Sequence, residues 1–272
     1  KGLKPVRQKL LDQLRRAVVG RHECADADVI VGVHFGDCTE ATSLPGRLDL
    51  QSPRAERGTA GMRLLSWNIH KGIGGRDRRY ALGRIIDCIE AENPDLVCLQ
   101  EVDRLVHRSN HDDQPRLLAR YFRCHSVFQP TVHVGAGTYG NLVLSRWPVV
   151  SRHRISLQQG MRKPRGAQLL LVDSPEGPLH LVNTHLGLAE SERRWQVGRL
   201  LGHFLFRSAE PHPTLVVGDF NDWRDSLSRD LFTDGGFRQV TSPAARFRTF
   251  PAWMAMGALD KAFTRGGITV RT

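Results

Sequence analysis

The sequence predicts an α/β protein, built as α+β layers around a mixed sheet. Apolar runs of strand length alternate with two segments of helical periodicity. Some strands follow one another through a helix and others follow in close succession, which argues against a purely doubly wound fold. The chain has 272 residues, of which 40% are hydrophobic and 25% are charged, so it is long enough for one large domain or two small ones.

Two helices and seven strands are predicted from residue 62 onward. One helix covers Tyr80–Glu92, where apolar residues recur at helical spacing between Leu82 and Ile89, and the other covers Ser191–Phe206. The strands are short apolar runs bounded by turn-forming residues. They are Arg63–Asn68, Asp95–Gln100, Gly140–Ser145, Ala167–Val172, Leu179–Thr184, Thr214–Gly218 and Leu259–Phe263.

Residues 1–61 differ from the rest of the chain. The segment PVRQKLLDQLRRAVV predicts an amphipathic helix, and DVIVGVHF, residues 28–35, predicts a short strand. Residues 36–61 are rich in turn formers and have little periodicity. The pattern sharpens at Met62, so we expect residues 1–61 to be an N-terminal extension and residues 62–272 to form the domain.

The chain is strongly basic. Its formal net charge is +11 and its isoelectric point is near 10.1. Such a surface attracts polyanions, which include nucleic acid, an anionic membrane surface and phosphorylated metabolites. An arginine-rich composition without any such partner explains the charge equally well. No aromatic residues interleave with a basic patch, so nothing indicates a stacking platform for single strands.

Composition also bears on the compartment. No apolar run approaches the roughly 20 residues that span a bilayer, and the basic N-terminal segment lacks the apolar core and cleavage site of a signal peptide. The five cysteines are scattered and form no Cys-x-x-Cys pair. This pattern favours a reducing compartment over a disulfide scaffold or a zinc site. We therefore expect a cytoplasmic protein.

Polar side chains follow several apolar strands at the point where each strand ends. Residues two apart on a strand project from one face, so the pairs in LVNTHLG and VVGDFND each present two groups together. Each residue alone has an ordinary structural explanation, such as a turn cap, a surface acid or a core histidine. Their succession instead favours one shared cleft. The residues are Asn68, Glu101, Asn183, His185, Asp219, Asn221 and Asp260.

This set of side chains suits phosphoester chemistry. Carboxylates and carboxamides are ligands for a hard cation such as Mg²⁺, or alternatively Mn²⁺, whereas the soft ligands that select zinc or copper are absent from these positions. A histidine near such a metal can bind a phosphoryl oxygen or carry a proton. A metal that polarises a phosphoryl group and a carboxylate that orients water together make a phosphoester hydrolase.

The motifs WNIH, LQEVD, GNLVLSRWPV, NTHL, GDFND and LDKAF occur in this order. Together they resemble the endonuclease/exonuclease/phosphatase superfamily, over about residues 62–272. That superfamily includes pancreatic-type deoxyribonucleases, abasic-site endonucleases, neutral sphingomyelinases and inositol polyphosphate phosphatases. The resemblance implies a four-layer α/β/β/α sandwich of two packed mixed sheets, with a cleft at one rim.

The resemblance also implies roles for individual residues. Glu101 matches the Mg²⁺ ligand and Asn68 supports the metal site. Asp219 matches the acid that orients or deprotonates the attacking water, and Asn221 positions that water and the phosphate. The remaining assignments are His185 at the scissile phosphate, Asp260 in support of the metal site or the final histidine, and Tyr139, Asn141, Asn183 and Arg165 on the substrate side. For Arg165, a solvated surface arginine is an equal alternative.

One departure from the superfamily stands out. Its closing Ser-Asp-His motif does not occur in this sequence, which ends with GGITVRT. We therefore expect the last core strand to be missing and this chain to be weakly active or inactive. The leading hypothesis is a monomeric Mg²⁺-dependent phosphoesterase acting on a nucleic-acid or phospholipid-type substrate. The alternative is a non-catalytic basic module that binds nucleic acid or anionic lipid on the same scaffold.

Overall fold

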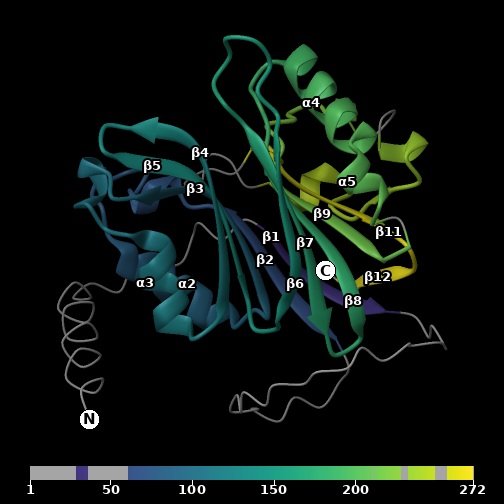
Figure 1. The fold of residues 1–272 in the computed structure, drawn as a ribbon, viewed down its shortest axis with the longest axis horizontal. Coiled ribbons are helices and arrows are strands. Elements are labelled where there is room, and N and C mark those ends of the chain that lie inside the picture. The colour runs from purple at the N-terminus through teal and green to yellow at the C-terminus, as the bar shows by residue number, and fades with distance from the viewer. Residues whose placement is uncertain (1–28, 36–60, 210, 228–231, 249–255, 272) are drawn as a thin grey trace.

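Two six-stranded sheets pack face to face, and helices cover their outer faces (Figure 1). The computed structural model describes residues 29–35, 61–209, 211–227, 232–248 and 256–271. Helices α2 (Leu82–Glu92) and α3 (Gln114–Phe122) lie on one side, and helices α4 (Glu190–Gly202) and α5 (Phe204–Arg207) lie on the other (Figure 1). The expected four-layer α/β/β/α sandwich is therefore confirmed.

The first sheet is mixed. Strands β2 and β3 run parallel, as a helical crossover through α2 requires, and every other neighbouring pair is antiparallel. The order is β12 (Ile268–Arg271), β1 (Val29–Phe35), β2 (Met62–Asn68), β3 (Leu96–Arg104), β5 (Gly137–Ser145) and β4 (His125–Val134).

The second sheet repeats this plan. Strands β8 and β9 run parallel and are joined through α4 and α5, while the other pairs are antiparallel. The order is β10 (Arg238–Gln239), β11 (Asp260–Arg265), β9 (Thr214–Asp219), β8 (Gly177–His185), β7 (Gly166–Ser174) and β6 (Val149–Ser156). Three short 3₁₀ helices complete the described elements: η1 (His70–Gly72), η2 (His107–Ser109) and η4 (Ala244–Arg246).

Three apolar clusters hold the layers together. One contains α2, α3 and the outer face of the first sheet, and a second contains α4, α5 and the outer face of the second sheet. The third lies between the sheets. Its members include Met62, Leu64, Leu96, Cys98 and Val143 from the first sheet and Leu170, Val172, Leu179, Leu181, Leu215 and Val217 from the second.

Toward one edge, the layer between the sheets becomes polar. Three buried amide side chains replace the apolar ones there. The Asn183 side chain accepts a hydrogen bond from Gln100 Nε2 at 2.8 Å and donates to Gln168 Oε1 at 3.0 Å. It also donates to two backbone carbonyls of the first sheet. We call Gln100, Gln168 and Asn183 the amide network. It ties the sheets together where the strands reach the site described below.

All seven predicted strands and both predicted helices are present, with ends shifted by up to four residues. The second helix is divided at His203, which has an extended backbone and caps α5. Helix α3 and strands β4, β6, β10 and β12 were not predicted. Their sequences are short or alternate weakly, and tertiary pairing decides their conformation.

The N-terminal segment contributes to the sandwich. The strand expected at residues 28–35 is β1, and it pairs antiparallel with both β2 and β12 although it precedes the expected domain start at Met62. Strands β1 and β12 continue the first sheet beyond β2. The helix expected near residues 5–19 lies outside the described residues. In the described part of the chain, no helix has the length and apolarity needed to cross a bilayer.

Candidate active site

The site lies where the carboxyl ends of the two parallel strand pairs meet. In register, Asn68 is the partner of Gln100 and His185 is the partner of Asp219, so both pairs end at the same edge. The Asn68 side chain donates from Nδ2 to Asp219 Oδ2 at 2.9 Å. This hydrogen bond joins the first sheet to the second and brings the WNIH and GDFND motifs together, as their strand-end positions predicted.

Asp219 is the centre of this arrangement. Its Oδ1 accepts from the backbone N–H of Asn221 at 3.0 Å, and its Oδ2 lies 3.4 Å from His185 Nε2. Burial raises the pKa of Asp219 to about 6, assisted by the charge of Glu101 and opposed by the hydrogen bonds from Asn68 and Asn221. A carboxylate that titrates near neutral pH is suited to accept a proton during a reaction.

Gly218 allows β9 to approach β8 closely just before Asp219. Its φ is +142°, and a Cβ at this position would lie 1.8 Å from the carbonyl oxygen of Thr184. No other residue could occupy this position without a shift of the backbone. The glycine of the GDFND motif therefore sets the spacing between His185 and Asp219.

His185 is buried and held in one tautomer. Its Nδ1 lies 3.1 Å from Nη1 of Arg165. A guanidinium is always protonated and can only donate, so Nδ1 accepts and the ring proton resides on Nε2, facing Asp219. Burial lowers the pKa of His185 well below its usual value, and the neighbouring Arg165 charge lowers it further. The imidazole is therefore neutral at pH 7.

Glu101 faces Asp219 from the first sheet. It sits in a bulge of β3 with a φ of +57°, a rare conformation for a residue other than glycine. Lys71 forms an ion pair with Glu101 Oε2. Burial alone would raise the pKa of Glu101. The charge and hydrogen bond of Lys71, the neighbouring His185 and a hydrogen bond from the Tyr139 hydroxyl together outweigh burial, and the pKa falls to about 2. Glu101 is thus ionised at any pH near neutrality, whereas Asp219 opposite it gains a proton as the pH falls through about 6.

Asn221 and Asp260 also lie at this edge. Asn221 has a φ of +51° and donates from its side chain to the Leu186 carbonyl at 3.0 Å, which anchors the turn after β9. Asp260 begins β11 and is the direct cross-strand partner of Asp219, so both side chains are on one face of the sheet. The structure therefore brings Asn68, Glu101, His185, Asp219, Asn221 and Asp260 together.

Two predicted substrate contacts are placed elsewhere. Asn183 is completely buried, and its amide group forms hydrogen bonds with Gln100 and Gln168 of the amide network. Asn141 is also buried and donates from Nδ2 to the Gly166 carbonyl at 3.1 Å, which links β5 to β7. Both face the interior between the sheets, because their positions on the strands point inward. Their amide groups are held between the sheets next to the site, and their role in substrate binding stays a prediction.

The structure adds residues that the sequence analysis missed. Lys71 follows the WNIH motif directly, and Lys163 precedes β7 in RKPRGA, two residues before the predicted Arg165. Arg108 forms a bidentate ion pair with the buried Asp103 of the LQEVD motif, at 2.8 and 2.7 Å. A cation placed one to three residues from a motif carries no periodic signal, so only the adjacency of Lys71 to WNIH could have indicated it.

The donor set suits a hard divalent cation. In the described ranges, no group of three His, Cys, Asp or Glu side chains is arranged to hold a metal ion by itself. Glu101 is a buried carboxylate that stays charged beside the Lys71 ammonium, which makes it the candidate ligand for a cation. Mg²⁺ often takes one or two protein carboxylates and completes its shell with waters and substrate phosphates. Glu101, with Asn68 beside Asp219, fits that pattern.

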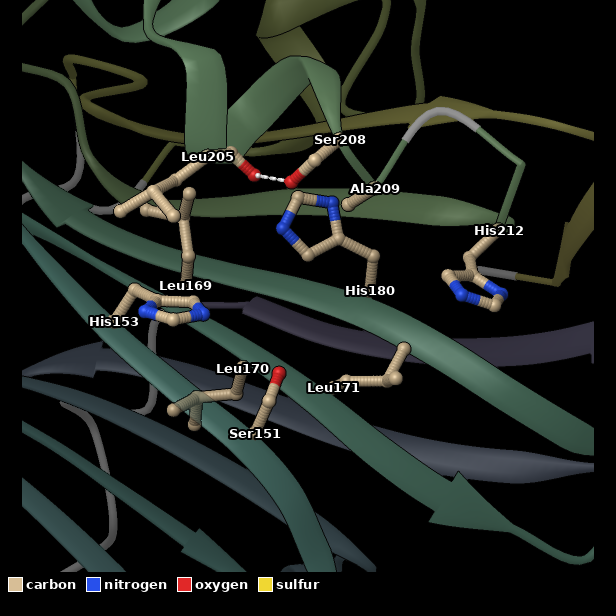
Figure 2. Close-up of a pocket in the computed structure, with 10 residues that line it drawn as sticks. All are labelled: Ser151, His153, Leu169, Leu170, Leu171, His180, Leu205, Ser208, Ala209 and His212. Atoms are coloured by element: carbon tan, nitrogen blue, oxygen red, sulfur yellow. Dashed lines mark hydrogen bonds between the residues drawn. The ribbon is translucent and has the colours of Figure 1, made fainter. Parts of the chain in front are cut away.

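A second, distinct pocket lies on the outer face of the second sheet, beneath α5 (Figure 2). It is lined by Ser151, His153, Leu169, Leu170, Leu171, His180, Leu205, Ser208, Ala209 and His212. Its volume of about 110 Å³ is well below the roughly 300–1,000 Å³ of small-molecule sites. Burial, assisted by Arg265, His212 and His153, lowers the pKa of His180 to about 4. This pocket contains none of the residues assigned to the cleft.

Comparison with known proteins places the chain in a family. Residues 65–272 match the Endonuclease/Exonuclease/phosphatase family. The uncharacterized protein YbhP of Escherichia coli K12 is 28% identical over 214 residues, which cover 75% of this chain and 84% of that protein.

Solved structures agree on the fold. An endonuclease/exonuclease/phosphatase protein from Beutenbergia cavernae has a TM-score of 0.60 at 23% identity, and the match covers 75% of this chain and 64% of that one. The human Nocturnin catalytic domain with bound sulfate has a TM-score of 0.56 at 19% identity, covering 78% and 86%. TDP2 from C. elegans has a TM-score of 0.55 at 20% identity, covering 75% and 64%.

The family includes nucleases and phosphatases, its enzymes are typically hydrolases of phosphoester bonds, and they generally use divalent metals. The motif order, the four-layer sandwich and the strand-end site agree with this match. The chain belongs to the endonuclease/exonuclease/phosphatase family.

Proposed function

We propose that this protein is a Mg²⁺-dependent phosphoesterase that hydrolyses phosphodiesters, of nucleic-acid or phospholipid type, by attack of water. The observation that carries the proposal is the environment of Asp219. This carboxylate is buried, is oriented by Asn68 and by the N–H of Asn221, has a pKa raised to about 6, and lies opposite the permanently charged Glu101.

Each residue has a role in the proposed reaction. Asp219 orients a water molecule and takes its proton as the water oxygen attacks phosphorus and the bond to the leaving oxygen breaks. His185 presents its Nε2 proton beside Asp219 and can donate to a phosphoryl oxygen. A divalent ion held by Glu101, with Asn68 in support, would supply positive charge that polarises the phosphoryl group.

The test is hydrolysis of bis-p-nitrophenyl phosphate across a Mg²⁺ titration, with Mn²⁺ in parallel. Wild-type protein is compared with Asp219→Asn, Glu101→Gln and the control Asp87→Asn, which removes an exposed carboxylate on α2. We expect Asp219→Asn to lose turnover at saturating metal and Glu101→Gln to require more metal. Equal, metal-dependent turnover in wild type and Asp219→Asn would refute the proposal.

A second function has one observation in its favour. The formal net charge of +11 suits a basic module that binds nucleic acid or anionic lipid without catalysis. In that case the same assay would show no turnover, and binding to duplex DNA would weaken steeply with added salt because counterions are released on binding. Retained turnover separates the two functions directly.

A further inference from the structure

Three cations lie within 6 Å of the buried ring of Tyr139 beside the proposed active site, and a fourth cation acts on this residue electrostatically. The side-chain nitrogens of Lys71 and Lys163 lie 5.8 and 5.0 Å from the ring centroid, and the Arg108 guanidinium carbon lies 5.4 Å from it. Arg165, the fourth, contacts His185 and opposes the rise in the pKa of Tyr139 that burial causes. We call Lys71, Arg108, Lys163 and Arg165 the cation rim. A single aromatic ring with three cations within 6 Å is well above the usual frequency of such contacts.

Only half of the cation rim is neutralised. Lys71 pairs with Glu101, and Arg108 pairs with Asp103. Among the described residues, Lys163 and Arg165 form no ion pair with a carboxylate, and the partner of Arg165 is the neutral His185. Two positive charges therefore lie side by side at the cleft without a protein counter-charge.

One buried donor in the same place has no protein acceptor. Arg165 Nε is buried without a hydrogen bond, and Arg165 is only 8% exposed. A buried donor without an acceptor is costly, so such groups usually indicate a bound water or ligand. The missing group must supply several acceptor oxygens and negative charge.

We propose that Lys163 and Arg165, beside the ring of Tyr139, form a subsite for a phosphomonoester group that the substrate carries next to its scissile phosphodiester. The inference rests on the proposed function, since it names the substrate class of the same cleft. A phosphomonoester has a second pKa near 6 and carries close to two negative charges at pH 7, which matches the two unneutralised cations. Its terminal oxygens can accept hydrogen bonds from Arg165 Nε and from the Lys163 ammonium.

The state of Lys163 agrees with this assignment. Burial and the neighbouring charges of Arg165, Lys71 and Arg108 lower its pKa, against the opposing effect of Glu101. The positive charges therefore repel one another in the substrate-free protein, and an anion at the rim would relieve that repulsion. A substrate with only a diester phosphate would leave the rim unsatisfied.

The test measures binding without turnover, in EDTA, by calorimetry at fixed ionic strength. Two matched pairs of probes distinguish the source of the phosphate: the dinucleotide TpT against its 5′-phosphorylated form, and glycerophosphoinositol against its 4-phosphate. We expect the phosphorylated member of at least one pair to bind about tenfold or more tightly, because charge-assisted hydrogen bonds contribute on that scale. The pair that shows the preference identifies nucleic-acid ends or inositol head groups.

Variants locate the preference. Lys163→Met should abolish most of it, and Lys163→Arg should retain it. Arg120→Met, on the exposed face of α3, is a control that removes one positive charge elsewhere. Equal affinity within both probe pairs, or a preference that Lys163→Met leaves intact, would overturn the subsite. A preference without Mg²⁺-dependent turnover would retain the subsite and refute only the proposed function.

Discussion

The space between the two sheets is dry and apolar at one end and polar at the other. Strand β8 passes through both parts, because its inward-facing residues are Leu179, Leu181, Asn183 and His185 in succession. The two leucines belong to the core cluster, Asn183 belongs to the amide network, and His185 contacts Asp219. One strand thus provides core packing, a polar scaffold and a reactive group in order along its length.

At the polar end, hydrogen bonds between the sheets take the place of apolar packing. Amide side chains satisfy one another and the backbone across the gap, so they exclude solvent while keeping strand ends in register. The apolar end contributes stability through burial, whereas the polar end contributes position. Substitutions at the two ends should therefore separate activity from stability.

The largest expected effect is on activity at the polar end. Asp219→Asn should lower turnover of a phosphodiester by about 10²–10⁴-fold, because the group that accepts the proton is lost. Stability at pH 7 should change little, since the neutral isostere avoids burying a charge. Steady-state kinetics and thermal unfolding of the same preparations check both statements. A large loss of stability would show that Asp219 is mainly structural.

At the apolar end, Leu181→Ala should have the opposite profile. Leu181 is fully buried between the sheets, and its truncation should cost about 2–5 kcal/mol of unfolding free energy through lost burial and a cavity. Below the new unfolding midpoint, turnover should remain within a few-fold of wild type. Urea unfolding provides the free energy. A loss of turnover in fully folded protein would contradict the separation of the two ends.

The amide network lies between these extremes. Asn183→Leu should cost roughly 1–3 kcal/mol, because it leaves Gln168 Oε1 and two carbonyls buried without a donor. It should also lower turnover, since the strand ends lose their positioning. The double variant Asn183→Leu with Gln168→Leu should be less destabilised than the sum of the single variants. Strict additivity would mean that the network does not couple the sheets.

The smallest effect concerns His180, on the opposite face of β8 from His185. Its pKa is lowered to about 4, below the unfolded value of 6.5, so the unfolded chain binds the proton more tightly. Stability from this group is therefore present above pH 6.5 and is lost as the pH falls toward 4. Between pH 7 and 5 the loss should be about 2 kcal/mol.

His180→Leu measures that contribution by difference. Urea unfolding at pH 7 and pH 5 should show a smaller acid loss in the variant than in wild type, by about 2 kcal/mol. The buried His185 remains in both proteins, so its own acid sensitivity cancels. Identical pH profiles would show that His180 is not the group that titrates.

The sequence predicted most of the sandwich and most of the cleft. Apolar strands such as β3 and β9 have clear patterns, and residues toward their carboxyl ends, such as Glu101 and Asp219, meet at one edge of the sandwich. Asn141 and Asn183 were assigned to the substrate because a motif does not reveal which face of a strand is covered. Lys163 was missed because its position depends on a loop whose path no local pattern specifies.

The hydrogen bond from Asn68 to Asp219 joins residues that are 151 positions apart in the chain. Closing so long a loop is entropically costly, and contacts of this kind form late in folding. Neither sheet alone contains both partners, so a half-folded chain has no assembled site. Hydrolysis should therefore recover only after the sheets dock, and the time course of regained activity would report the last step of folding.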